Sequence, residues 1–192
     1  MKQHLRIAIL MTLVTTVLFG LLYPLAVTGI GQLFFPAQAN GELIVQNGKV
    51  VGSRLIGQPF TAAWYFHPRP SNAGNGYDPV APSGGASNLG PTNRQLIDRV
   101  KNDVEKLHAE NPSMAIPVDM VTTSASGLDP DISPAAAEFQ IPRVARERHV
   151  SEAELRVLVA KHTLGRLLEV LGEPRVNVLE LNLELDATYP KK

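Results

Sequence analysis

The chain has 192 residues with 18 basic and 18 acidic side chains, and 44% of its residues are hydrophobic. A net charge of zero gives no electrostatic footprint for nucleic acid, which basic proteins bind through phosphate contacts. The chain has no cysteine, which excludes disulfides, thiolate nucleophiles and cysteine-bound zinc. The residues after the N-terminal apolar run suffice for one domain with its own hydrophobic core.

An apolar run of 29 residues without a charged side chain extends from Ile7 to Phe35. About 20 apolar residues in a helix cross a bilayer core of about 30 Å, and a helix satisfies its own backbone hydrogen bonds in lipid. We therefore predict a membrane-spanning helix from about Ile7 to Val27. Residues 28–35 should leave the membrane, and Pro36 should end any helix.

Charges near the N-terminus predict the orientation of this helix. Lys2 and Arg6 favour the cytoplasmic side, so residues 1–6 form a cytoplasmic tail and residues 36–192 an extracytoplasmic domain. The alternative is a cleaved signal peptide, because Ala37-Gln38-Ala39 fits the small-residue cleavage pattern. The apolar run is about twice as long as a signal sequence requires, which favours a retained anchor.

Small and hydroxyl side chains recur along one face of the apolar run. Thr12, Thr16 and Gly20 are spaced i, i+4 and i+8, and such residues allow helices to approach closely in lipid. We predict that this face packs against another membrane helix, with Pro24 bending the helix outward.

Beyond the membrane, Asn47-Gly48 lies between two apolar segments and predicts a β-hairpin over about Glu42 to Arg54. Trp64-Tyr65-Phe66 is interpreted as a core strand or a patch at the lipid boundary. From Pro68 to Pro91, five prolines and five glycines in 24 residues indicate a long loop. Its scattered apolar residues predict an ordered loop that packs on a partner or on the domain's own surface.

Helices dominate the middle of the predicted domain. Apolar spacing predicts one from Thr92 or Asn93 to Asn111, and Ser133-Pro134 marks the start of a second that Pro142 should interrupt. Ser151 to Glu154 is a capping box that opens a third. The alternation of Leu with polar residues from Leu179 to Leu185 predicts a final strand. The soluble part is therefore predicted to be a mixed α/β (α+β) domain.

Motifs that carry chemistry are missing from the sequence. No phosphate-binding loop, zinc-protease motif or nucleophile elbow occurs, and we predict no catalytic residue and no metal site. Asp129 to Ser133 imitates the start of a calcium loop but lacks its Gly and its Glu. Ser83-Gly84-Gly85 is weak evidence for a nucleotide contact. The charged stretch from Arg143 to Arg148 is interpreted as a solvated helix face.

Several ordered motifs together resemble the C subunit of the Kdp potassium-transporting ATPase, a bacterial high-affinity uptake system. The match runs from the N-terminal helix to the last predicted strand. Its motifs are Gly52-Ser53, Ile56 to Phe60, Tyr65-Phe66, Arg69 to Ser71, Ser83 to Gly85, Ser87 to Pro91, Asn93, Ser126 to Pro134, His162-Thr163, Gly165-Arg166 and Gly172 to Asn182.

The resemblance implies a non-catalytic subunit in the bacterial inner membrane. Its partners would be a channel-like, potassium-binding A subunit, a P-type ATPase B subunit and the lipid bilayer. ATP and K+ would act at the level of the complex. The family is also described as raising the ATP affinity of the B subunit. The helix face would dock on the A subunit, and Arg69, Ser71 and Asn88 in the loop would contact it. The alternatives are a membrane-tethered extracytoplasmic enzyme and a binding module.

Overall fold

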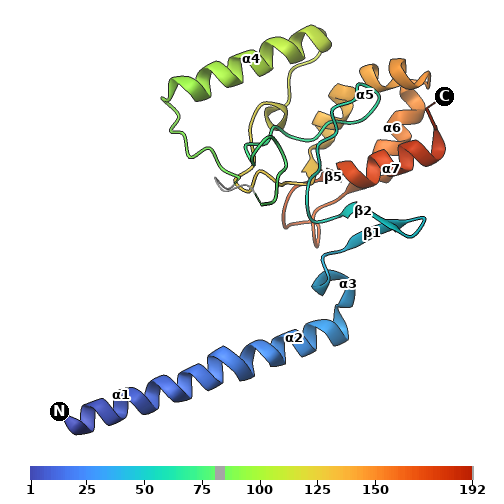
Figure 1. The fold of residues 1–192 in the computed structure, drawn as a ribbon. Helices are drawn as coiled ribbons and strands as arrows, with labels where there is room; N and C mark the ends of the chain where they lie inside the picture. The colour runs from blue at the N-terminus through green and yellow to red at the C-terminus, as the bar shows by residue number, and fades with distance from the viewer. Residues whose placement is uncertain (81–84, 192) are drawn as a thin grey trace. The chain divides into compact units, whose positions relative to one another are not determined.

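The computed structural model describes residues 1–80 and 85–191 (Figure 1). The chain divides into two compact units, Met1–Val51 and Gly52–Lys192. The first unit contains the long N-terminal helix and most of a β-hairpin. The second contains a small sheet and four α-helices.

The N-terminal helix runs without a break from Lys2 to Phe34, and none of its residues is buried within the chain. It consists of α1 (Lys2–Thr15), a π-helical stretch (Thr16–Leu22) and α2 (Tyr23–Phe34). Among the described residues it is the one helix long and apolar enough to cross a membrane. It contains the predicted span and continues seven residues beyond Val27.

The π-helical stretch lies directly before Pro24, and the proline explains the change in winding. A proline has no N–H to donate to the carbonyl four residues back, and its ring clashes with that carbonyl in an α-helix. In the π-helical stretch, the Tyr23 N–H instead donates to the Leu18 carbonyl five residues back. The helix therefore passes through Pro24, and the predicted outward bend remains a prediction.

The first unit ends in a short helix and a hairpin. The helix ends at Phe34, and a new turn, α3 (Pro36–Ala39), begins with Pro36 at its first position. The strands β1 (Leu43–Gln46) and β2 (Lys49–Ser53) then pair. Asn47 and Gly48 have φ angles of 52° and 75°, as a type I′ turn requires, so the predicted hairpin is confirmed.

The second unit contains a three-stranded antiparallel sheet in the order β3-β5-β4. Its strands are short: β3 (Asp131–Ile132), β4 (Thr163–Leu164) and the central β5 (Arg175–Asn177). Ile132 and Thr163 are both paired with Val176, which is fully buried. Mixed helices and strands confirm the predicted fold class.

Side-chain caps fix the starts of the helices in the second unit. Asn93 caps α4 (Arg94–Glu110), Ser133 caps α5 (Pro134–Arg148), and Ser151 forms the predicted capping box of α6 (Glu152–Lys161). These three helix starts are confirmed. A 3-10 turn (Val118–Met120) lies between α4 and α5.

The hydrophobic core lies where α5 and α6 meet the sheet and the C-terminal helix, as the neighbouring ribbons in Figure 1 show. The largest fully buried apolar side chains of this core come from α5, α6, α7 and one irregular segment. They are Phe66, Ile141, Leu155, Leu181 and Leu185.

The C-terminal segment is a helix, α7 (Val178–Thr188), so the prediction of a strand from Leu179 to Leu185 is wrong. Leu and Glu dominate this segment and both favour helices. Its buried residues also fit helical spacing, and they include Val178, Leu181, Asn182 and Leu185. Asn177 caps the helix, since its side-chain oxygen accepts a hydrogen bond from Glu180 N.

The predicted interruption at Pro142 is also wrong, because α5 continues through it to Arg148. An internal proline costs about 3 kcal/mol through the lost hydrogen bond and the ring clash. Burial on both sides of Pro142 offsets that cost, since Ile141 and Val144 are fully buried.

Candidate functional site

The predicted packing face lies on the exposed surface of the N-terminal helix. The Thr12 hydroxyl donates to the Ala8 carbonyl at 2.9 Å, which satisfies this polar group inside the helix. At Gly20 a Cβ atom would meet only the Thr16 methyl group, 3.8 Å away. Thr16 and Gly20 therefore lie together over an open surface, and Pro24 follows at the start of α2.

Arg69 and Ser71 from the predicted partner loop hold that loop to the domain itself. Arg69 Nη1 lies 2.8 Å from Asp129 Oδ2, and Ser71 Oγ donates to the Gly127 carbonyl at 2.6 Å. The Tyr77 hydroxyl donates to the Arg69 carbonyl at 2.6 Å, and burial raises the pKa of Tyr77. Residues 69–77 of this loop therefore pack on the domain's own surface, one of the two predicted arrangements.

Asn88 differs from Arg69 and Ser71 because it is exposed, with a positive φ of 52°. Contact of these three residues with a partner remains a prediction.

The weak nucleotide motif falls partly outside the described residues, because Ser83 and Gly84 are not described. Gly85 is described, and it lies against the segment around Gly127. A Cβ atom at Gly85 would lie only 1.5 Å from the Ser126 carbonyl oxygen. A glycine is therefore needed here for two loops to approach closely, and this geometry accounts for Gly85 without a phosphate.

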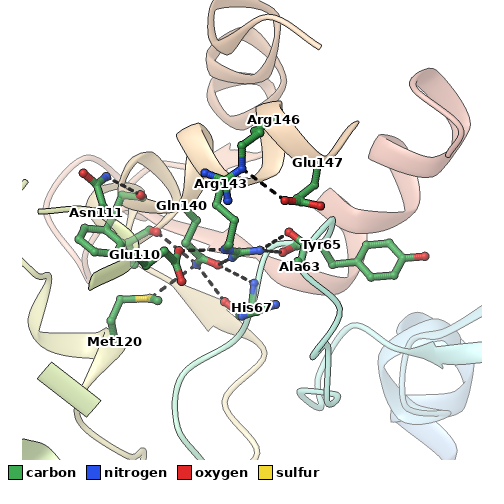
Figure 2. Close-up of polar contacts among 12 residues, drawn as sticks. Ala63, Tyr65, His67, Glu110, Asn111, Met120, Gln140, Arg143, Arg146 and Glu147 are labelled. Atoms are coloured by element: carbon green, nitrogen blue, oxygen red, sulfur yellow. Dashed lines mark hydrogen bonds and ion pairs between the residues drawn. The ribbon is translucent and has the colours of Figure 1, made fainter. Parts of the chain in front are cut away.

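Polar side chains of α5 form a buried cluster around the aromatic segment of residues 64–67 (Figure 2). We call Gln140, Arg143 and Arg148 the α5 polar cluster. Arg143 binds Glu110 Oε1 at 2.8 Å, and it also donates to the carbonyls of Ala63 and Tyr65. Figure 2 shows its guanidinium among these acceptors, whereas Arg146 contacts Glu147.

The other members of the α5 polar cluster also form hydrogen bonds with the backbone of residues 64–67. Gln140 accepts from His67 N at 2.7 Å and donates to His67 O at 3.1 Å. Arg148 donates to the Trp64 carbonyl at 2.9 Å. On α7, Asn182 makes two further hydrogen bonds of 2.9 Å with the backbone of Phe66.

The aromatic segment is therefore part of the core but does not form the predicted strand. Phe66 is fully buried, and side chains from α5 and α7 take the place of a neighbouring strand. The interpretation of residues 143–148 as a solvated face is wrong for Arg143 and Arg148, which are both buried. It holds for Arg146. Sequence spacing missed this cluster, although Arg143 and Arg148 share a stretch of α5 with buried apolar residues.

Burial and charge also perturb His67, whose ring lies beside the α5 polar cluster. Desolvation lowers the pKa of His67, and the nearby positive charge of Arg143 lowers it further. Both effects favour the neutral imidazole. A ring nitrogen of His67 lies 3.0 Å from the Ala62 carbonyl oxygen.

An open cleft of about 510 Å³ is lined by charged residues from the loops and the sheet. Both arginines that line it are paired with carboxylates: Arg69 binds Asp129 at 2.8 Å, and Arg175 binds Asp131 at 2.9 Å. Asp119 accepts hydrogen bonds from the backbone and the hydroxyl of Ser133, at 2.7 and 3.0 Å. Asp119, Asp129 and Asp131 thus connect the segments that line the cleft.

Burial raises the pKa of Asp131, although Arg175 and Asn177 oppose this shift.

Within residues 1–80 and 85–191, no group of three or more His, Asp or Glu side chains could hold a metal ion.

Comparison with known proteins covers nearly the whole chain. The family described as "KdpC: K+-transporting ATPase, c chain" matches residues 5–187. A protein of Koribacter versatilis is 63% identical over 190 residues, which cover 99% of this chain and 97% of that protein. One from Rhodopseudomonas palustris is 59% identical over 198 residues, with 97% and 99% covered. One from Bradyrhizobium diazoefficiens is 56% identical over 202 residues, with both chains fully covered.

All three relatives are named potassium-transporting ATPase KdpC subunit. The resemblance that the sequence motifs indicate is thus confirmed. The chain belongs to the KdpC family, the c chains of K+-transporting ATPases.

Proposed function

We propose that this chain is the non-catalytic assembly subunit of a high-affinity, ATP-driven potassium uptake complex in the bacterial inner membrane. Residues 1–6 form the cytoplasmic tail, residues 7–35 the membrane helix and its exit, and residues 36–192 the extracytoplasmic domain. Lys2 and Arg6 support this orientation through the positive-inside rule. The family supports the assignment to a potassium-transporting ATPase.

The observation that carries the proposal is a long apolar helix that no described part of the chain covers. All of its side chains lie outside the core, and its described apolar residues are about half exposed or more. Such a surface is stable only in lipid or against other membrane helices. The chain therefore serves its complex by contact with lipid and with other subunits.

The channel-like A subunit is the proposed neighbour of the face formed by Thr12, Thr16 and Gly20. Gly20 leaves room for another helix to approach the backbone, which favours close packing in lipid. The extracytoplasmic domain would then pack at the outer mouth of that subunit. There it would take part in assembly and in access of potassium to the complex.

Any influence on ATP affinity of the B subunit must be indirect in this topology. Nucleotide is cytoplasmic, and only residues 1–6 of this chain would lie on that side. The proposed route is therefore mechanical: the helix stabilises one conformation of the membrane subunits, and the B subunit responds to that conformation.

Replacing Gly20 with Leu tests the packing face. The substitution fits the isolated helix, because a Cβ atom at Gly20 meets only one methyl group. We expect the amount of complex recovered with the tagged chain to fall about tenfold, equivalent to about 1.4 kcal/mol of association free energy. Affinity purification from membranes, with subunits identified by mass, measures this.

Gly29→Leu is the matched control, since a Cβ atom there meets nothing within 4 Å. Gly29 follows Gly20 by nine residues and therefore lies on a different side of the helix. It should leave recovery unchanged. Equal recovery of the Gly20→Leu chain and the wild type, with normal potassium uptake, would remove this face from the proposal.

A further inference from the structure

An apolar projection between β4 and β5 has no role in the proposed packing face. We call residues 164–173 the apolar finger. Five large apolar side chains in it are exposed to solvent: Leu164, Leu167, Leu168, Val170 and Leu171. A cluster of this kind on a soluble unit is typical of a binding surface, whereas single exposed apolar residues need no explanation.

The apolar finger is held in one shape by its own backbone. Leu167 and Leu171 exchange two backbone hydrogen bonds of 2.8 and 2.9 Å, which close the tip. Leu168 and Glu169 both have positive φ angles, 53° and 63°, which non-glycine residues rarely adopt. Leu168 and Val170 are therefore exposed at a tip whose backbone has an unfavourable conformation.

Charge in the apolar finger distinguishes a protein partner from a lipid surface. Segments that lie on anionic bilayers carry free Lys or Arg side chains beside their apolar face. Here the one basic residue, Arg166, is bound by both carboxylate oxygens of Glu173 at 2.9 and 2.7 Å. Glu169, at the tip, adds a negative charge that anionic headgroups would repel. The finger thus fits an apolar pocket in a protein better than a membrane.

We infer that the apolar finger docks into an apolar pocket on another protein subunit of the ATPase complex. This inference rests on the proposed function, because it requires that the chain assembles with such subunits. Leu168 and Val170, 77% and 75% exposed, are the side chains that enter the pocket. Burial of several exposed apolar side chains at one site is the usual source of interface affinity.

A double variant, Leu168→Asn with Val170→Thr, tests the contact without removing the shape of the finger. Asn tolerates the positive φ at position 168, and Thr keeps the branched shape of Val170. The recovery of ATPase subunits with the tagged full chain should fall at least tenfold. Val157→Thr is the matched control: Val157 is 71% exposed on α6, outside the apolar finger, and recovery should not change.

A photoreactive benzophenone amino acid at position 168 of the full chain, irradiated in native membranes, identifies the occupant. The expected product is an adduct with the mass of another ATPase subunit. An adduct only with phospholipid, one only with a second copy of this chain, or no adduct at all would each overturn the inference.

These results also separate the finger from the proposed function. If the unmodified chain recovers no ATPase subunits, the proposed function fails. If the unmodified chain and the double variant recover them equally, only the docking of the finger fails.

Discussion

At the scale of single residues, the buried arginine of the α5 polar cluster stabilises a segment that has no strand beside it. Arg143 connects Glu110 at the end of α4 with the carbonyls of Ala63 and Tyr65. The effect of removing it should be larger than that of a surface ion pair, because the Arg143 side chain is buried and the partly buried Glu110 and Tyr65 would lose their donor.

We expect Arg143→Met to lower the free energy of unfolding by about 3 kcal/mol or more. Arg146→Met on the same helix is the control, and because its side chain is exposed it should change stability by less than about 0.5 kcal/mol. Thermal and denaturant unfolding of the full chain in detergent measure both variants. Equal stability of the two would contradict the assigned role of Arg143.

The lowered pKa of His67 predicts that the stability of the domain depends on pH. Its pKa in the folded chain lies below the ordinary value of 6.5, so the unfolded chain binds the proton more readily. The stabilisation is complete above the unfolded pKa and is lost as the pH falls below it. We expect the unfolding free energy of the wild type to decrease from about pH 7 to about pH 5.

In His67→Gln this decrease should be smaller, since an amide can donate to the Ala62 carbonyl without titrating. Unfolding curves recorded across the pH series provide the measurement. A variant with the same slope as the wild type would show that His67 is not the titrating group.

At the scale of helices and strands, Pro142 is an unfavourable residue that α5 tolerates. Pro142→Ala restores a backbone donor toward the Glu138 carbonyl and removes the ring clash, which should stabilise the folded helix by about 3 kcal/mol. The alanine also raises the conformational entropy of the unfolded chain, which should lower stability by about 1 kcal/mol. The net expectation is a rise of about 2 kcal/mol in unfolding free energy.

Pro134→Ala serves as the comparison, because Pro134 stands at the first position of α5, where proline is favourable. This variant should gain no stability. A Pro142→Ala protein no more stable than wild type would mean that α5 bears no cost at this position.

Local signals predicted the elements whose ends are fixed by near neighbours. Asn93, Ser133 and Ser151 cap helices within their own sequence, and Asn47-Gly48 defines its turn alone. The strand predicted over α7 failed because Leu179 to Leu185 fits both spacings, and tertiary packing chose the helix.

The buried role of Arg143 could not be predicted, because its acceptors lie 78 and 80 residues away in the chain. Thr12, Thr16 and Gly20 could be grouped into the predicted packing face from their spacing along one helix, without any long-range contact. Arg69, in contrast, depends on a distant carboxylate, Asp129, that sequence spacing does not pair with it.

At the scale of the whole molecule, the absence of cysteine permits a direct test of orientation. Gln3→Cys places one thiol in the N-terminal tail, and Ala109→Cys places one on the exposed surface of α4. A membrane-impermeant maleimide added to intact spheroplasts should label position 109 and leave position 3 unlabelled.

Lysis of the same cells before labelling is the control, and both positions should then react. Labelling of position 3 alone in intact cells would place the domain in the cytoplasm and exclude contact at the outer mouth of the complex.

The pairing of Phe66 with Asn182 has a consequence for the order in which the protein matures. The two residues are 116 positions apart, and a chain emerges from the ribosome N-terminus first. The backbone of Phe66 therefore cannot form its two hydrogen bonds with Asn182 until α7 has been synthesised. Nascent chains arrested before α7 should be digested by protease at this aromatic segment, and full-length chains should resist.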